Sequence, residues 1–176
     1  NDGTNTGRRR FLTAATSAVA AAGAVGIAVP FLGSWNPSAK AKAAGAPVKF
    51  DAGKMEPGQL VRVEWRGQPV FVIRRTQAQI DSLIENDGDL KDPESLASSQ
   101  PTYVDSRNRA VKSEFLVLVG LCTHLGCSPK YIKKLDSAAP DASWNGGFFC
   151  ACHGSKFDMA GRVYKGVPAS ENLVVP

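Results

Sequence analysis

Hydrophobic and polar positions divide the chain into an apolar N-terminal run and a longer region of short alternating segments. Residues 11–39 contain no charged side chain, and residues 11–32 are rich in alanine and valine. As an α-helix, residues 11–32 would be about 33 Å long, close to the hydrocarbon thickness of a bilayer. The pattern predicts one transmembrane anchor over residues 11–32. A cleaved signal peptide is the competing interpretation, but Ala39-Lys40-Ala41 is a poor cleavage site.

The residues on either side of this run differ in character. Residues 1–7 are polar, and we expect them to be disordered. Arg8-Arg9-Arg10-Phe11-Leu12 resembles a twin-arginine export signal, which is read by the machinery that moves folded proteins. Residues 1–10 are therefore predicted to form a cytoplasmic tail, with the remainder of the chain beyond the membrane. Residues 33–47 (GSWNPSAKAKAAGAP) contain small, polar and breaker residues, which predicts a linker.

Beyond the linker, the spacing of apolar residues changes to that of short strands. Val48–Asp51, Gln59–Trp65 and Val70–Arg75 are β-prone, and Arg66-Gly67-Gln68 predicts a hairpin turn between the last two. Residues 76–86 have helical spacing instead. In this segment Ile80, Leu83 and Ile84 share one face, and Thr76 with Gln79 forms a capping box.

The second half of this region is predicted to be a polar insertion followed by further strands. Residues 87–109 form the insertion. The predicted strands are Phe115–Leu121, Gly147–Phe149, Gly161–Tyr164 and Asn172–Pro176. Residues 48–176 are therefore expected to fold as one mainly β domain.

The charge of the chain is concentrated outside that domain. The whole chain has a net charge of +5, and the residues through Lys42 contain five Lys or Arg against Asp2 alone, a net charge of +4. The difference, 5 − 4, leaves +1 for the rest. No basic patch interleaved with aromatic residues is evident there, so a nucleic-acid partner is not expected.

The candidate chemistry lies in two windows, Cys122–Cys127 (CTHLGC) and Cys150–Ser155 (CACHGS). They contain all four cysteines and both histidines of the chain. Each window combines a cysteine and a histidine two or three positions apart with a second cysteine. Such clustering predicts a metal site.

The spacing narrows the choice of metal. Zinc sites usually draw cysteines from C-x2-4-C pairs, and Cys150-x-Cys152 is too close to chelate one ion comfortably. An all-cysteine C-x4-C-x2-C cluster fails because position 130 is Lys130. A binuclear iron cluster with two cysteines on one iron and two histidines on the other remains. Structural zinc stays open as the alternative.

The two windows resemble the box motifs of the Rieske [2Fe-2S] proteins. The resemblance implies a Rieske-type antiparallel β-sandwich with a small cluster-binding subdomain, residues 120–170, preceded by the membrane helix. It implies one [2Fe-2S] cluster per subunit. The site residues that it implies are the iron ligands Cys122, His124, Cys150 and His153, a disulfide between Cys127 and Cys152, and Ser155 as a hydrogen-bond donor to a cluster sulfur.

Three positions near the predicted cluster depart from the family's pattern, and at the first of them Ala151 replaces the proline that is usual in the second box. Phe157 stands where many members carry a tyrosine that donates to a ligand cysteine, so this donor is missing. Gly166–Ala169 resembles the family's proline loop, but Ser170 replaces a frequent second proline. Members of the family usually continue through a further terminal hairpin beyond the position of Pro176.

The resemblance also implies a function, within the Rieske subunits of bacterial cytochrome bc1 complexes (ubiquinol:cytochrome c reductases). Such a subunit takes an electron from ubiquinol at cytochrome b and delivers it to cytochrome c1, in a dimeric complex of the inner membrane. The cluster domain would lie in the periplasm, with residues 33–47 as a hinge. His153, with His124, would take the quinol proton, and Leu125 and Pro168 would contact cytochrome b.

Two other functions fit the same motifs. One is the small Rieske subunit of a periplasmic oxidase such as arsenite oxidase, which shares the export signal and both boxes. The other is a zinc-stabilised module without redox function. Extraction together with b- and c-type haems would distinguish the first, and visible absorption the second.

Overall fold

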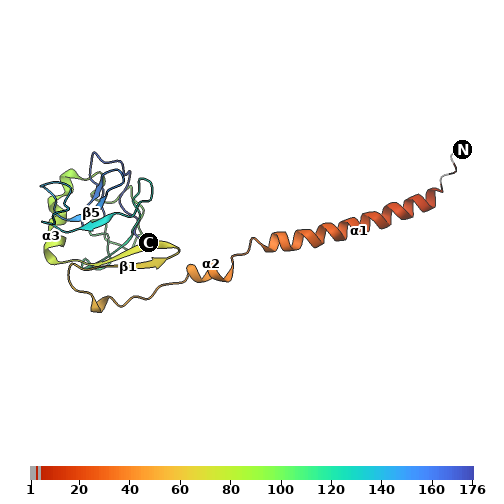
Figure 1. The fold of residues 1–176 in the computed structure, drawn as a ribbon, viewed down its shortest axis with the longest axis horizontal. Coiled ribbons are helices and arrows are strands. Elements are labelled where there is room, and N and C mark those ends of the chain that lie inside the picture. The colour runs from red at the N-terminus through yellow and green to blue at the C-terminus, as the bar shows by residue number, and fades with distance from the viewer. Residues whose placement is uncertain (1–2, 4) are drawn as a thin grey trace. The chain divides into compact units, whose positions relative to one another are not determined.

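An N-terminal helix and a β-rich unit are the two parts of the computed structural model, which describes residue 3 and residues 5–176 (Figure 1). The division between the two units falls between Gly45 and Ala46.

Helix α1 (Thr6–Gly33) begins earlier than the sequence indicated. The side chain of Asn5 accepts a hydrogen bond from the Arg8 amide at 3.1 Å and caps the helix, so the three arginines lie inside its first turns. Thr6 and Gly7 are thus helical, contrary to the expectation of disorder, while residues 1, 2 and 4 of that segment lie outside the described residues. The 28-residue helix is long and apolar enough to cross a membrane.

The predicted linker contains a short helix, α2 (Ala39–Ala44). Ser38 caps it by accepting from the Ala41 amide at 3.1 Å. The strand predicted at Val48–Asp51 is wrong: the chain there is irregular and enters the 3-10 turn η1 (Ala52–Lys54). The Asp51 carboxylate accepts from the Gly53 amide at 3.0 Å, and this local turn competes with extended pairing.

The first sheet is antiparallel and has the strand order β1-β2-β3. Its strands are β1 (Leu60–Trp65), β2 (Gln68–Arg74) and β3 (Phe115–Val119). Trp65 pairs with Gln68, so Arg66 and Gly67 form a two-residue turn with φ of 53° and 71°. Two positive φ angles match the twist of a tight hairpin. The predicted hairpin is confirmed.

Helix α3 (Gln77–Glu85) follows this hairpin and has the predicted capping box. The Thr76 hydroxyl accepts from the Gln79 amide at 3.3 Å, and the Gln79 side chain accepts from the Thr76 amide at 2.9 Å. The predicted apolar face is partly wrong, because Leu83 is 1% exposed but Ile84 is 66% exposed. Ile84 lies about 100° around the helix from Leu83, away from the side that packs.

Removal of the capping hydroxyl tests how much the box stabilises α3. We expect Thr76→Ala to lower the free energy of unfolding of residues 46–176 by about 1 kcal/mol, because one amide of the first turn loses its acceptor. Chemical denaturation measures the change. Thr102→Ala, in an exposed turn, is the control and should leave the unfolding midpoint unchanged.

The second sheet, β4-β5-β6, is also antiparallel and carries the second candidate window. Its strands are β4 (Lys130–Ile132), β5 (Gly147–Cys150) and β6 (Ser155–Phe157). The sequence predicted β5 but neither β4 nor β6, which are too short to show an alternating pattern. The predicted strand at Gly161–Tyr164 reduces to isolated pairings, and the described residues 172–176 form no strand.

The two sheets share one apolar core. Phe71 of the first sheet stacks on Phe148 of the second with ring centroids 5.8 Å apart, and both are fully buried. The core also includes Ile73, Leu83, Leu116, Leu118, Phe157, Met159, Val163 and Leu173, together with Cys122 and Cys150. The mainly β, antiparallel fold is therefore confirmed, and the two candidate cysteines lie at the edge of its core.

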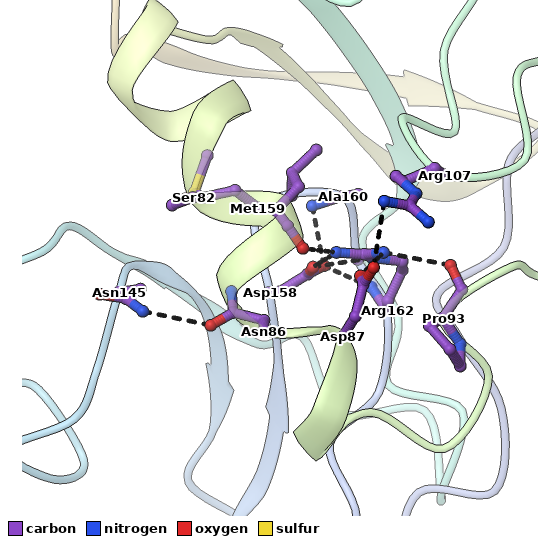
Figure 2. A network of polar contacts seen from close by, with 12 residues as sticks. Ser82, Asn86, Asp87, Pro93, Arg107, Asn145, Asp158, Met159, Ala160 and Arg162 are labelled. Carbon is purple, nitrogen blue, oxygen red and sulfur yellow. Dashed lines mark hydrogen bonds and ion pairs between the residues drawn. The ribbon is translucent and has the colours of Figure 1, made fainter.

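Three arginines are buried around the turn that follows β6, which the sequence did not predict. Arg75, Arg109 and Arg162 are each at most 2% exposed. All three bond to the turn 158–162 that follows β6, and Figure 2 shows Arg162 against the carboxylates of Asp158 and Asp87. Arg109 ends the predicted polar insertion, which otherwise consists of turns and the 3-10 turn η2 (Asp87–Asp89).

Candidate metal centre

The two candidate windows lie on two loops with different connections. The first loop, residues 120–129, leads from β3 of one sheet to β4 of the other, whereas the second, residues 151–154, is the turn of the β5–β6 hairpin. The first loop therefore joins the two sheets and is not the turn of a hairpin, because β3 pairs with β2 and not with β4.

Both loops nevertheless close with the same local turn. The Gly126 amide donates to the Cys122 carbonyl, and the Gly154 amide donates to the Cys150 carbonyl, at 2.9 Å in each case. Both glycines have a φ of 78°, which a side chain would strain. The glycine four residues after each cysteine thus turns the chain so that the intervening histidine lies at the loop's tip.

Glycine is also required where β5 begins. A Cβ atom at Gly147 would lie 2.0 Å from the Phe157 carbonyl oxygen, and the φ of Gly147 is 145°. The strand can therefore approach β6 closely only with glycine at this position. This approach brings Cys150 into register with Ser155 at the hairpin end.

The four predicted ligands lie on these loops as a pair of thiols and a pair of imidazoles. Cys122 and Cys150 are 4% and 2% exposed and are free thiols. The rings of His124 and His153 are perpendicular, with centroids 4.7 Å apart. His124 is half-buried and His153 is exposed. The arrangement offers two sulfur atoms inside and two imidazoles further out.

The donor set fits a metal group on two observations. Nδ1 of His124 is buried and has no hydrogen-bond partner among the described residues, which is costly for a polar atom unless a ligand occupies it. Burial also raises the pKa of the Cys150 thiol, and the neighbouring Cys122 raises it further, so two thiolates here require a cation to balance them. Two sulfurs and two nitrogens match a mixed-ligand iron-sulfur cluster.

The other two cysteines, Cys127 and Cys152, form the predicted disulfide. It joins the first loop directly to the second. The sulfurs of Cys127, Cys150 and Cys152 all lie within 4.8 Å of one another, which is close enough for the three to bind one metal ion. Two of these three sulfurs are already bonded to each other and cannot act as thiolates, which leaves Cys150 as the ligand of that group.

A third loop, residues 166–171, borders the site. The Ser155 hydroxyl, fully buried, accepts from the Ala169 amide at 3.1 Å, which leaves its own proton for another acceptor. The Thr123 hydroxyl donates to the Glu171 carbonyl at 2.6 Å and ties the first loop to the third. Thr123 was not among the predicted site residues, and no sequence signal distinguished it from a solvated threonine.

The remaining predicted residues are placed as follows. Leu125 is 71% exposed, and Pro168 is exposed on the third loop. Both are available for contact with another protein. Phe157 is fully buried in the core and brings no hydroxyl to the position of the missing tyrosine.

Comparisons with known proteins agree with this geometry. A family model described as "Rieske [2Fe-2S] domain" matches residues 47–176, and one described as "Ubiquitinol-cytochrome C reductase Fe-S subunit TAT signal" matches residues 1–38. The ubiquinol-cytochrome c reductase iron-sulfur subunit of Allochromatium vinosum is 52% identical, over 99% of this chain and 84% of that protein. The proteins of the same name from Blastochloris viridis and Bradyrhizobium diazoefficiens are 45% and 40% identical, each over 96% of this chain and over 85% and 86% of their own. With a family model covering most of its length and relatives of one name at this similarity, the chain belongs to the Rieske [2Fe-2S] family, among the iron-sulfur subunits of ubiquinol-cytochrome c reductases.

Proposed function

We propose that this protein is the electron-transfer subunit of a membrane-bound ubiquinol:cytochrome c reductase. It takes an electron from ubiquinol at cytochrome b and passes it to cytochrome c1. The observation that carries the proposal is the pair of histidine rings 4.7 Å apart, on two disulfide-linked loops that also supply two buried thiols. The names of the relatives agree with it.

Cys122 and Cys150 would hold the inner iron of the cluster, and His124 and His153 would hold the outer one. When bound, the cluster supplies one-electron chemistry at a potential that imidazole ligands raise towards that of quinol. His153 is exposed, so its ring meets the quinol and holds the quinol's proton at the nitrogen that is not used for ligation. The Ser155 hydroxyl would donate its free proton to a cluster sulfur, and this bond would raise the potential further.

The partner surface lies around the two histidines. Leu125, exposed beside His124, and Pro168 on the third loop give an apolar surface for cytochrome b. Apolar contact at this point would also keep water away from the outer imidazoles, which strengthens local electrostatic interactions.

The N-terminal part of the chain fits a membrane-anchored subunit. Helix α1 provides a single span, with residues 11–32 in the bilayer of the bacterial inner membrane and the arginines of residues 8–10 on the cytoplasmic side. Residues 33–47 act as the hinge of the cluster domain, which begins at residue 48 and lies in the periplasm within a dimeric complex.

Electron paramagnetic resonance of the full-length protein tests the proposal. After mild reduction with ascorbate, we expect a rhombic signal typical of mixed histidine and cysteine ligation, together with extraction alongside b- and c-type haems. A signal that requires dithionite would show a low-potential cluster and exclude quinol as the donor. A colourless protein that contains zinc would exclude electron transfer altogether.

A further inference from the structure

The third loop, residues 166–171, contacts the two ligand loops. It also accepts hydrogen bonds from Lys91 of the insertion, residues 87–109. The ammonium group of Lys91 donates to the Val167 carbonyl at 2.8 Å and to the Ala169 carbonyl at 2.6 Å. The Lys91 side chain thus bonds to two carbonyls of the third loop, which lie 76 and 78 residues further along the chain.

These two carbonyls flank the peptide that contacts Ser155. The peptide bond between Pro168 and Ala169 lies between them, and its amide donates to the fully buried Ser155 hydroxyl at 3.1 Å. With both neighbouring peptides bonded to one ammonium group, the direction of this amide is fixed. The Ser155 oxygen therefore accepts from one defined side, and its own proton must point elsewhere.

The backbone of Lys91 is itself firmly held. Its amide donates to the Val163 carbonyl at 2.9 Å, and the preceding Leu90, 1% exposed, pairs with Tyr164. The Lys91 ammonium therefore starts from a fixed position, and its bonds to carbonyls are charge-assisted. A flexible side chain on a mobile loop could not provide this restraint.

We propose that Lys91 is a positioning residue for the cluster: it keeps the third loop closed and so orients the Ser155 hydroxyl towards the cluster. Ser170 follows residues 167–169 at a position where the family often has a second proline. The two hydrogen bonds from Lys91 restrain the loop in place of that proline ring. The proposal rests on the proposed ligation of the cluster by the two loops. Lys91 acts through Ala169 and Ser155 and does not touch the reacting atoms.

The test uses Lys91→Met in the full-length holoprotein. We expect hydrogen exchange of peptides covering residues 166–171 to become at least about tenfold faster, because the loop opens locally. We also expect the equilibrium constant for reduction to fall about three- to tenfold, which for a one-electron couple lowers the midpoint potential by about 30 to 60 mV. Mass spectrometry and a redox titration followed by paramagnetic resonance measure the two effects.

Two lysine variants serve as controls. Lys165→Met removes an equal charge immediately before the same loop, where the ammonium donates to the Gly88 carbonyl at 2.8 Å and not to residues 167–169. It should leave both measurements near those of the wild type. Lys91→Arg keeps the charge and can reach both carbonyls, so it should restore slow exchange and the potential. Lys91→Gln, too short to reach both, replaces Lys91→Met if that variant does not accumulate.

The outcomes separate this inference from the proposed function. If the wild type shows no Rieske signal, the proposed function fails. If every variant carries the cluster but Lys91→Met behaves like Lys165→Met in both exchange and potential, Lys91 is only a surface lysine and the inference is wrong. A changed potential with unchanged exchange would also overturn it, because the charge alone would then explain the effect.

Discussion

Replacement of Cys122 by serine is expected to abolish cluster binding completely. Cys122 is one of two buried free thiols, and a serine hydroxyl in its place is a poor ligand for iron. The variant should lose both irons of the [2Fe-2S] cluster, its acid-labile sulfide and its paramagnetic signal. Iron analysis and resonance of the purified full-length protein measure the loss.

The matched control changes the disulfide instead of the ligand. In the double variant Cys127→Ser, Cys152→Ser, both proposed cysteine ligands remain, so the cluster should assemble but be released faster because the loops are no longer joined. Comparison of the two variants shows whether iron binds through Cys122 and Cys150 or through the other set of cysteine sulfurs. If iron bound through Cys127, Cys150 and Cys152, which lie within 4.8 Å of one another, Cys122→Ser would keep its iron and the double variant would lose it.

Replacement of Asp158 by asparagine should destabilise the β-rich unit by about 3 to 5 kcal/mol, the cost of leaving a buried cation without its partner. One carboxylate oxygen of Asp158 bonds to Nε and Nη2 of Arg162, at 2.8 and 2.7 Å, and both residues are fully buried. The other oxygen accepts from the amides of Ala160 and Arg162 at 2.9 and 2.8 Å. The carboxylate of Asp158 therefore neutralises the Arg162 guanidinium and also stabilises the turn formed by residues 158–162.

The other two buried arginines increase this cost. Burial lowers the pKa of Arg75 and of Arg109 to about 10, so both remain charged at neutral pH. Arg75 donates to the Met159 carbonyl at 3.2 Å, and Arg109 donates to those of Ala160 and Gly161 at 3.3 Å. Without the Asp158 charge, all three cations would lose a carboxylate that they share, and Arg162 would keep its ion pair with Asp87 at 2.8 Å, which Figure 2 shows beside it.

Asp136→Asn is the control for this variant, measured by chemical denaturation of the same protein. Asp136 lies in an exposed turn and accepts from the Ala138 amide at 2.9 Å, the same local bond that Asp158 makes to Ala160. It should change the free energy of unfolding by less than about 0.5 kcal/mol. Equal effects of the two substitutions would mean that the turn geometry, and not the buried charge, stabilises the fold.

The candidate site was more predictable than the fold around it. Its two loops are contiguous stretches whose residue types report their chemistry directly, so the windows at 122–127 and 150–155 were sufficient to indicate the metal centre. The hairpin at Arg66 and the capping box at Thr76 were predictable for the same reason, since each depends on residues within one turn of chain. The helix α1 needed only an unbroken apolar run.

The errors lie where partners distant in the sequence decide the outcome. Ile84 has the right spacing for the packed face of α3 but remains exposed, because the helix directs Leu83, and not Ile84, into the shared core. The strands β4 and β6 contain three residues each and exist only because β5 lies between them. Residues 172–176 have the composition of a strand, yet the described chain makes single bonds there, such as that from the Val119 amide to the Val174 carbonyl.

The sequence by itself determined the membrane-compatible helix and the class of the cofactor, since these follow from local composition and spacing. Only the tertiary structure showed that Arg75, Arg109 and Arg162 are buried around one turn. It also showed that Lys91 donates hydrogen bonds to the loop beside Ser155. The physical reason is the same in each case. A charged side chain is exposed and mobile by default, and its burial or fixed position here depends largely on acceptors that folding brings from tens of residues away.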